Sequence, residues 1–362
     1  MKKLVCILHL CVLALSATPT VLGGPKQATT PATIYFTKDV SGAGVLRVFD
    51  KIKAEVRGPT GIKVHFGEEG NRNYLRPEWV KPLAQKLSAP LVETNVLYVS
   101  PRHQTQSHLA LARKHGFDFS AIDILDSAAE VAWPCSTGRY AHVLVGSHTQ
   151  RYNTIVVVTH FKGHGLSGFG GAIKNVAMGL ASPMGKRAMH ANLVPGYDSS
   201  KCIRCGACTL NCQGKAIAID PVRIDPRKCI GCGQCLKVCP AGVYSAPQGR
   251  VGPEEFERRL AEYAKAIADS VHLVYVSVLA NISADCDCAG RARRPFVKDI
   301  GVLASTDPVA IDQASLDLVN KAHKSTDAFK RESGTSGAAQ LAHGERIGLG
   351  TRRYRLVDLD GK

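Results

Sequence analysis

The chain has 362 residues and 45% hydrophobic content, enough to bury a large core in two or three structural units. Its net charge is +16, but the basic residues are dispersed and no nucleic-acid-binding motif is present, so nucleic acid is not an expected partner. Thirteen cysteines would suggest a disulfide-rich secreted protein, yet eight of them belong to the two motifs described below. Few remain for disulfides, which excludes that class.

Residues 1–24 have the pattern of a secretory signal peptide. Lys2 and Lys3 precede an apolar run from Leu4 to Ala17, and small residues follow it. The run is shorter than the roughly 20 residues of a transmembrane helix, so we expect no membrane span in the mature chain. We expect export, to the periplasm. The cytoplasm is the alternative, because export of a folded cluster protein would require a twin-arginine signal, which is absent.

Residues 25–198 have the pattern of the first part of an α/β domain. Strand composition marks the segments 32–39, 62–67 and 95–100, and helical patterns occupy 41–53, 78–87 and 107–115. Alternating strands and helices predict parallel pairing in a layered sheet. We expect the histidines of this part to be surface or capping residues rather than ligands; they are His103, His108 and His115.

The segment 154–190 predicts a functional site. TIVVVTHF suits the middle of a parallel sheet, and the glycine-rich KGHGLSGFGG separates it from the helical AIKNVAMGLAS. A strand, a glycine-rich loop and a helix N-terminus together predict an anion site, because free backbone N–H groups point at whatever lies there. A nicotinamide cofactor is not expected, because the acidic residue of the dinucleotide fingerprint is missing about 20 positions further on.

The candidate catalytic residues are polar side chains in this apolar setting. His160, Lys162 and His164 follow the carboxyl end of the strand, the usual place for a site in an open α/β sheet. Lys174 and His190 follow in the next helical stretch. We expect the lysines to bind an anionic small-molecule substrate and a histidine to transfer a proton.

Residues 199–246 contain two copies of Cys-x2-Cys-x2-Cys-x3-Cys, around a pair of short strands at AIAID and VRID. This spacing predicts two [4Fe–4S] clusters, because three thiolates hold one cluster and the fourth reaches the other. A zinc ribbon fits less well, since it pairs Cys-x2-Cys with Cys-x2-Cys. The segment resembles a bacterial-type two-cluster ferredoxin. The predicted ligands are Cys202, Cys205, Cys208 and Cys239 for one cluster, and Cys229, Cys232, Cys235 and Cys212 for the other.

Residues 247–362 resume the α/β pattern, with a helix at 253–269, a buried strand at 272–282, a further strand and helix around Asp307-Pro308, and an edge strand near the end. We therefore expect an α/β fold, a layered and mostly parallel sheet domain into which the α+β ferredoxin module is inserted. Two separate domains flanking the module are the alternative.

The strand at 272–282 leads into Asp285-Cys286-Asp287-Cys288. Two cysteines in Cys-x-Cys directly after a strand predict a metal site or a redox pair. The alternatives are unreactive loop thiols, or a disulfide in an exported protein, although cysteines two residues apart are strained for that bond.

The chain resembles the family known as domain of unknown function number 362, in its form with a two-cluster ferredoxin. The resemblance rests on THFKGHGLSGFGGAIKNVAMGLAS, NISADCDC, STDPVAIDQASLDLV and GLGTRRY. It supports the fold and the clusters and implies no particular substrate. The recurrent polar positions that it implies are His160, Lys162, His164, Lys174, Asn175, His190, Asp285, Cys286, Asp287, Cys288, Asp307 and Asp312.

We expect an iron–sulfur oxidoreductase whose two clusters relay electrons to a site near HFKGHGLSGFGG and DCDC, because a bare electron carrier would not need the large remainder of the chain. The alternatives are a ferredoxin-like relay or binding protein without its own catalysis, and a metal- or cluster-handling protein. Basic residues among the cluster motifs, such as Lys201, Arg204 and Lys228, predict an acidic redox partner.

Overall fold

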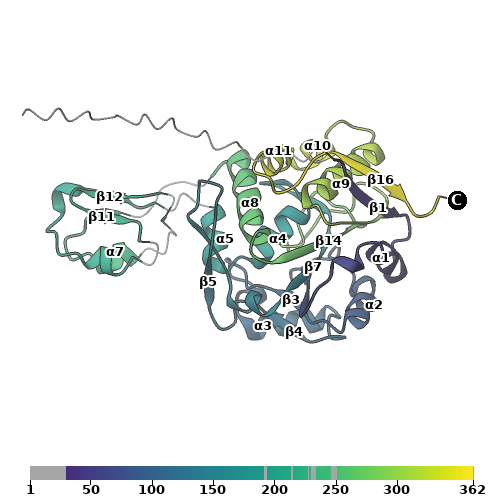
Figure 1. Ribbon diagram of the computed structural model, residues 1–362, viewed down its shortest axis with the longest axis horizontal. Coiled ribbons are helices and arrows are strands. Elements are labelled where there is room, and N and C mark those ends of the chain that lie inside the picture. The colour runs from purple at the N-terminus through teal and green to yellow at the C-terminus, as the bar shows by residue number, and fades with distance from the viewer. Residues whose placement is uncertain are drawn as a thin grey trace, which may run out of the picture.

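The computed structural model describes residues 30–190, 194–212, 215–226, 228–229, 234–245 and 251–361 (Figure 1). The predicted signal peptide, residues 1–24, and the predicted cluster ligand Cys232 lie outside these residues, so export stays a proposal. Within the described part of the chain, no helix combines the length and the apolar character needed to cross a bilayer.

An eight-stranded sheet forms the centre of the protein, in the order β16-β1-β15-β14-β7-β2-β3-β4. Within this sheet β15 runs antiparallel to both of its neighbours, and the other neighbouring pairs are parallel. The predicted α/β fold with a mostly parallel sheet is therefore confirmed. The strands are β1 (Ala32–Thr37), β2 (Thr60–Lys63), β3 (Leu91–Glu93), β4 (Ile122–Ile124), β7 (Thr154–His160), β14 (His272–Leu279), β15 (Gly301–Ser305) and β16 (Tyr354–Asp358).

Helices cover both faces of this sheet (Figure 1). One apolar layer contains α1 (Gly42–Phe49), α2 (Pro77–Leu87) and α3 (Thr105–Lys114). The other contains α4 (Ala172–Leu180), α5 (Pro183–His190), α8 (Pro253–Ala268), α9 (Pro308–His323), α10 (Ala328–Ser333) and α11 (Ala338–Arg346). Short 3₁₀ turns lie at Lys53–Glu55, Pro101–His103, Ser147–Arg151 and Ser199–Lys201.

The central strand β7 shows why this sheet needs a continuously apolar sequence. Successive side chains of a strand point to opposite faces. Ile155 and Val157 accordingly pack into the layer of α4 and α8, whereas Val156 and Val158 pack into the layer of α1 and α2. A strand that is covered on both faces has no solvent-facing positions, so its sequence cannot alternate polar and apolar residues.

Two sequence predictions in the first part of the chain are wrong. The segment 95–100 is a loop, and the strand lies just before it at Leu91–Glu93. The apolar side chains that suggested a strand, among them Val96 and Leu97, instead line a cavity. His108 is fully buried rather than at the surface, because its ring lies against Asn95 and Arg102 in the polar interior of the α3 layer.

The cysteine-rich segment, residues 199–246, forms a small unit of short strands and helices (Figure 1). The predicted strands at AIAID and VRID are present as the hairpin β11 (Ile217–Ile219) and β12 (Val222–Ile224). The strand β10 (Gly196–Tyr197) pairs with β13 (Tyr244–Ser245), and the helices are α6 (Ala207–Leu210) and α7 (Gln234–Val238). Strands from before and after this segment share the eight-stranded sheet, so both parts of the chain build one α/β domain.

A buried carboxylate from α9 caps the N-terminus of α4. Asp312 Oδ1 accepts a hydrogen bond from the Ala172 N–H at 2.6 Å, and Oδ2 accepts one from the Ile173 N–H at 3.0 Å. The contact requires glycine at position 171, since a Cβ there would lie 2.2 Å from Asp312 Oδ1. The prediction of a free anion site at this helix end is therefore wrong, because the carboxyl group of Asp312 already occupies it.

We predict that Asp312→Ala lowers the free energy of unfolding by about 2–4 kcal/mol, because it leaves two buried N–H groups without an acceptor. Asp312→Asn keeps one acceptor oxygen and should lose less. Urea unfolding measures both losses, and Lys321→Ala, at an exposed position of the same helix, is the control. Equal stabilities of Asp312→Ala and Lys321→Ala would contradict the capping role.

The same variants test a pH dependence. Burial raises the pKa of Asp312 to about 7 from an ordinary value of 3.8. The raised value means that ionisation is harder in the folded state, so this group makes the wild type lose stability as the pH rises from about 4 to about 7. Asp312→Asn should lack this contribution, and its unfolding free energy should vary less with pH over that range.

Candidate functional site

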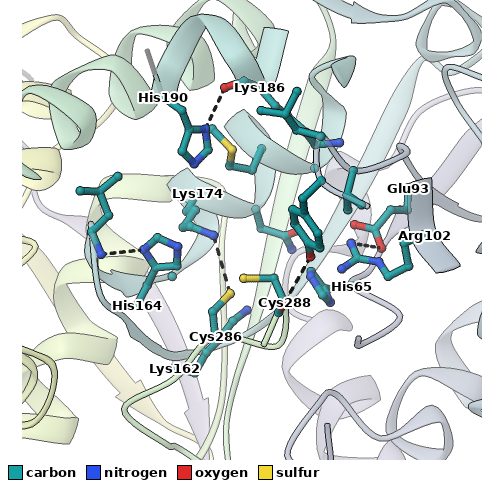
Figure 2. A pocket seen from close by; sticks show the side chains of 18 of the residues that line it. His65, Glu93, Arg102, Lys162, His164, Lys174, Lys186, His190, Cys286 and Cys288 are labelled. Atoms are coloured by element: carbon teal, nitrogen blue, oxygen red, sulfur yellow. Dashed lines mark hydrogen bonds and ion pairs between the residues drawn. The ribbon is translucent and has the colours of Figure 1, made fainter. Parts of the chain in front are cut away.

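A cavity of about 800 Å³ lies at the carboxyl ends of β2, β3, β7 and β14 (Figure 2). This is the edge where parallel α/β sheets usually bind ligands. Segments that are far apart in the sequence meet there because neighbouring parallel strands end side by side. Of the five candidate catalytic residues and the two DCDC cysteines, six line the cavity, namely Lys162, His164, Lys174, His190, Cys286 and Cys288.

The glycine-rich loop forms a small hairpin that places two of these residues. β8 (Lys162–His164) pairs with β9 (Gly168–Gly170) directly after the central strand. Gly163 lets the hairpin approach the loop after β14, because its N–H donates to the Ser283 carbonyl at 2.8 Å and a Cβ would lie 2.4 Å from the Ala284 carbonyl oxygen. The hairpin therefore brings Lys162 and His164 next to the DCDC segment.

The seventh predicted residue, His160, does not line the cavity. It is buried at the end of β7, where Nδ1 lies 2.8 Å from Asp287 Oδ1 and Nε2 lies 2.7 Å from the Ala280 carbonyl oxygen. Lys162 Nζ lies 3.2 Å from the other oxygen of Asp287. Burial alone would raise the pKa of Asp287, but His160 and Lys162 together lower this pKa by more than burial raises it. The carboxylate therefore stays ionised. His160 is thus a positioning residue for the DCDC segment.

Cys286 and Cys288 lie on either side of Asp287 and both face the cavity (Figure 2). A hydrogen bond from Cys288 lowers the pKa of Cys286 well below that of an ordinary thiol, and the same bond raises the pKa of Cys288. Lys174 Nζ lies 3.8 Å from Cys286 Sγ. The pair is therefore poised as one thiolate and one thiol, the state in which a cysteine is nucleophilic.

His164 presents one ring nitrogen to the protein and the other to the cavity. Its Nδ1 accepts hydrogen bonds from the backbone N–H groups of Leu166 at 3.2 Å and Ser167 at 3.1 Å. Burial, together with the charges of Lys174 and His190, lowers its pKa well below 6.5. The ring is therefore neutral, with its hydrogen on Nε2.

A group of buried charges behind the DCDC segment was not predicted from the sequence. Glu93 Oε1 lies 3.3 Å from Lys63 Nζ, while Glu93 Oε2 lies 3.5 Å from Arg102 and 3.7 Å from His108. Burial would raise the pKa of Glu93, but Lys63 and Arg102 hold it well below its usual range. Burial lowers the pKa of Lys63 to about 8, although Glu93 opposes this shift.

Lys186 adds a further amine to the cavity wall. Its Nζ donates to Thr94 Oγ1 at 2.6 Å and to the Asn95 carbonyl, and burial lowers its pKa to about 7. Cations outnumber anions among the described lining residues, where Glu93 is the carboxylate. The cavity can therefore hold an anion by side-chain charge. The lining cations are Lys63, Arg102, Lys162, Lys174, Lys186 and Arg187.

One sequence signal could have found part of this group. Lys63 and His65 occur in IKVHFG, at the carboxyl end of a predicted strand, just as His160 and Lys162 do in THFK. The same rule applied to that strand would have pointed to Lys63 and His65. Glu93 and Arg102 had no such signal, because the strand was predicted four residues too late.

Among the predicted cluster cysteines, Cys202, Cys205, Cys208, Cys212 and Cys239 are free thiols. Those assigned to the first cluster line one small pocket; they are Cys202, Cys205, Cys208 and Cys239. Backbone N–H groups point at three sulfurs, with Arg204 N 3.4 Å from Cys202 Sγ, Ala216 N 3.2 Å from Cys212 Sγ, and Val243 N 3.4 Å from Cys239 Sγ. Cys229 and Cys235 are partly buried.

Residues 60–317 match the family described as Domain of unknown function (DUF362), so the chain belongs to that family. Among curated proteins none matches the chain significantly. The family predicted from the sequence motifs is thus confirmed, whereas its ferredoxin-bearing form stays a proposal.

Two solved structures show remote similarity. The lactate racemase apoprotein from Thermoanaerobacterium thermosaccharolyticum is 11% identical, with 44% of this chain and 41% of that chain covered and a TM-score of 0.33. A protein from Thermotoga maritima is 7% identical, with 78% of this chain and 58% of that chain covered and a TM-score of 0.36. The chain spans less than two thirds of either protein, and similarity this low carries no argument about function.

We predict that Glu93→Gln lowers the free energy of unfolding by about 3–5 kcal/mol, because it leaves the buried charges of Lys63 and Arg102 without their carboxylate. Glu69→Gln is the matched control, since Glu69 also pairs with a lysine, Lys114, but at the surface. Thermal or urea unfolding should show a large loss for the first variant and little change for the second. Similar losses for both would show that the buried group does not depend on Glu93.

Proposed function

We propose that this member of the DUF362 family is an iron–sulfur oxidoreductase that reduces a small anionic substrate in the cavity, with electrons supplied by two [4Fe–4S] clusters. One observation carries the proposal. Thiols, imidazoles and amines predicted from three separate sequence segments line a single cavity of about 800 Å³. A protein that only relays electrons would not need such a cavity.

The attachment of the cysteine-rich segment supports a link between the clusters and the cavity. His190 and Val251 line the cavity, and they flank the chain that enters and leaves this segment. The Val251 N–H donates to the His190 carbonyl at 3.5 Å, which joins the two attachment points. The attachment points of the segment therefore lie at the cavity wall, which supports electron supply from the segment to the cavity.

The described cysteines fit iron–sulfur clusters. Four of them, the cysteines assigned to the first cluster, line one pocket together with apolar side chains such as Ile219 and Val243. Backbone N–H groups directed at cysteine sulfurs are the hydrogen bonds that stabilise cluster thiolates and set their potentials. When bound, the clusters would supply electrons one at a time.

The residues of the cavity would bind the substrate and deliver protons. Lys162 and Lys174 would hold its anionic group. His190 is placed to give a proton, whereas the neutral ring of His164 would donate a hydrogen bond through Nε2. Val96 and Leu97, at the cavity wall, would exclude water and strengthen these charge interactions.

We predict that anaerobically purified protein contains about eight iron and about eight sulfide per chain, with low-temperature EPR signals of reduced [4Fe–4S] clusters after dithionite treatment. Cys205→Ser should lose about half of the iron, because it removes one predicted ligand. Cys135→Ser is the matched control, since Cys135 is a free cysteine outside both motifs. Much less than about four iron per chain after reconstitution would overturn the clusters.

We predict that an acidic electron-transfer protein reduces the clusters at a rate that falls about tenfold or more as the ionic strength rises from about 0.01 M to about 1 M. The reason is the exposed basic side chains of the cysteine-rich segment, Lys201, Arg204, Lys215, Arg223 and Lys228. Stopped-flow absorbance measures the rate, and reduction by a small uncharged reductant is the control. A salt-independent rate would exclude an acidic partner.

A further inference from the structure

We infer that Cys286 and Cys288 form a reversible dithiol/disulfide pair that exchanges with a small anionic disulfide bound in the cavity. The inference rests on the proposed function for one point, the source of the electrons that reset the pair. It adds the substrate class and the residues that react.

The geometry places both sulfurs where a substrate would meet them. Both cysteines line the cavity, and their sulfurs lie within 4.8 Å of each other and of a ring nitrogen of His164. Neither forms a disulfide. The buried Asp287 between them is fixed by His160 and Lys162, so the two thiols are held as a pair on one wall.

The same three residues, His164, Cys286 and Cys288, are also a conceivable metal site. The hydrogen bonds of His164 argue against it. A histidine that binds a metal through one nitrogen donates an N–H from the other to a carbonyl, a carboxylate or water. Here the other nitrogen, Nδ1, faces two backbone N–H donors, from Leu166 and Ser167, and so carries no hydrogen. His164 Nε2 is therefore a hydrogen-bond donor toward the thiols and the substrate rather than a ligand.

The charges of the cavity select the substrate. Lys174 Nζ lies beside Cys286 Sγ, and Lys63, Arg102 and Lys186 line the same cavity. Acidic groups on both halves of a small disulfide would each find a cation while its sulfur–sulfur bond lies against the thiols. A cationic disulfide would be repelled.

The exchange balances in atoms and electrons. The Cys286 thiolate attacks one substrate sulfur, which breaks the substrate disulfide, forms a mixed disulfide and releases one thiolate. Cys288 then gives its proton to a released thiolate and attacks the Cys286 sulfur, which forms the internal disulfide and releases the second thiolate. Two electrons have passed from the pair to the substrate. Two electrons from the redox partner, supplied through the clusters, and one proton restore the thiolate and the thiol.

A disulfide between cysteines two residues apart suits this cycle. Such a bond closes a small strained ring and is more easily reduced than a structural disulfide. It would therefore accept electrons readily in the resetting step and would not persist as a structural bond.

The test uses the full-length protein, reduced and freed of reductant under anaerobic conditions. It is exposed to excess 3,3′-dithiodipropionate, a dianion, to uncharged 2-hydroxyethyl disulfide, or to cystamine, a dication. Alkylation and mass spectrometry then follow the tryptic peptide 266–291, in which Cys286 and Cys288 are the cysteines. We expect both thiols to become protected at least about tenfold faster with the dianion than with the uncharged probe, and slowest with cystamine.

Single variants separate a reacting pair from two structural thiols. Cys288→Ser should accumulate one probe half bound to Cys286, whereas Cys286→Ser should form no such adduct at a comparable rate. Lys174→Met should reduce the preference for the dianion, and Lys321→Ala, at an exposed site, should not. Thiols that stay fully alkylatable, or rates independent of probe charge, would overturn the inference. So would a bound metal ion that is lost in Cys286→Ser while the cluster iron is kept.

Iron analysis of the same samples keeps this test distinct from that of the proposed function. Exchange in protein that cannot hold iron would refute the clusters and leave the thiol pair standing. Full iron content without exchange would refute the thiol pair and leave the clusters standing.

Discussion

The buried contact of Asp287 with His160 and Lys162 determines the form of the cavity. The two strands β7 and β14 run parallel, so their carboxyl ends meet, and the carboxylate of Asp287, in the loop after β14, contacts the His160 ring at the end of β7 and the Lys162 amine just after it. An unpaired carboxylate could not be buried there, and an unpaired lysine would be equally costly. The contact that pairs the carboxylate of Asp287 with the amine of Lys162 fixes the backbone on either side of Asp287. This places Cys286 and Cys288 on the cavity wall.

The wall behind this contact carries more positive than negative charge. Glu93 neutralises part of it, and burial lowers the pKa of Lys63 and Lys186 so that these amines can give up protons near neutral pH. The folded protein thus tolerates the excess of basic groups because some of these amines lose their protons and become neutral. An anionic ligand would remove the need for that neutralisation, and this complementarity is the main physical argument for an anionic substrate.

Many strands and helices of the α/β domain could be predicted because their sequence patterns are local. The apolar run of β7, the Ser41 cap of α1, and the Asp307 cap and Pro308 start of α9 all depend on residues close together in the sequence. The loop at 95–100 was mistaken for a strand because an apolar cavity wall and a buried strand have the same composition. Periodicity cannot separate them in so short a segment.

The candidate site was predictable only where the reactive residues follow strong strands. Lys162, His164 and Cys286 were found in this way, and the structure brings them together. The role of His160 could not be predicted, because its partner Asp287 lies 127 positions away. The cap of α4 by Asp312 was hidden for the same reason, and it changes the chemistry: backbone groups at that helix end cannot bind the substrate, so side chains must.

The need for side-chain amines to bind the substrate couples anion binding to proton uptake. An anion beside Lys63 or Lys186 stabilises the charged amine and raises its pKa, and both values otherwise lie near neutrality. Binding at neutral pH would therefore draw protons into the cavity. In the disulfide exchange inferred above, the departing thiolates of the substrate also need protons, and they need them in the same cavity. Amines that are held partly neutral by burial are thus suited both to attract the substrate and to bring in the protons that its reduction consumes.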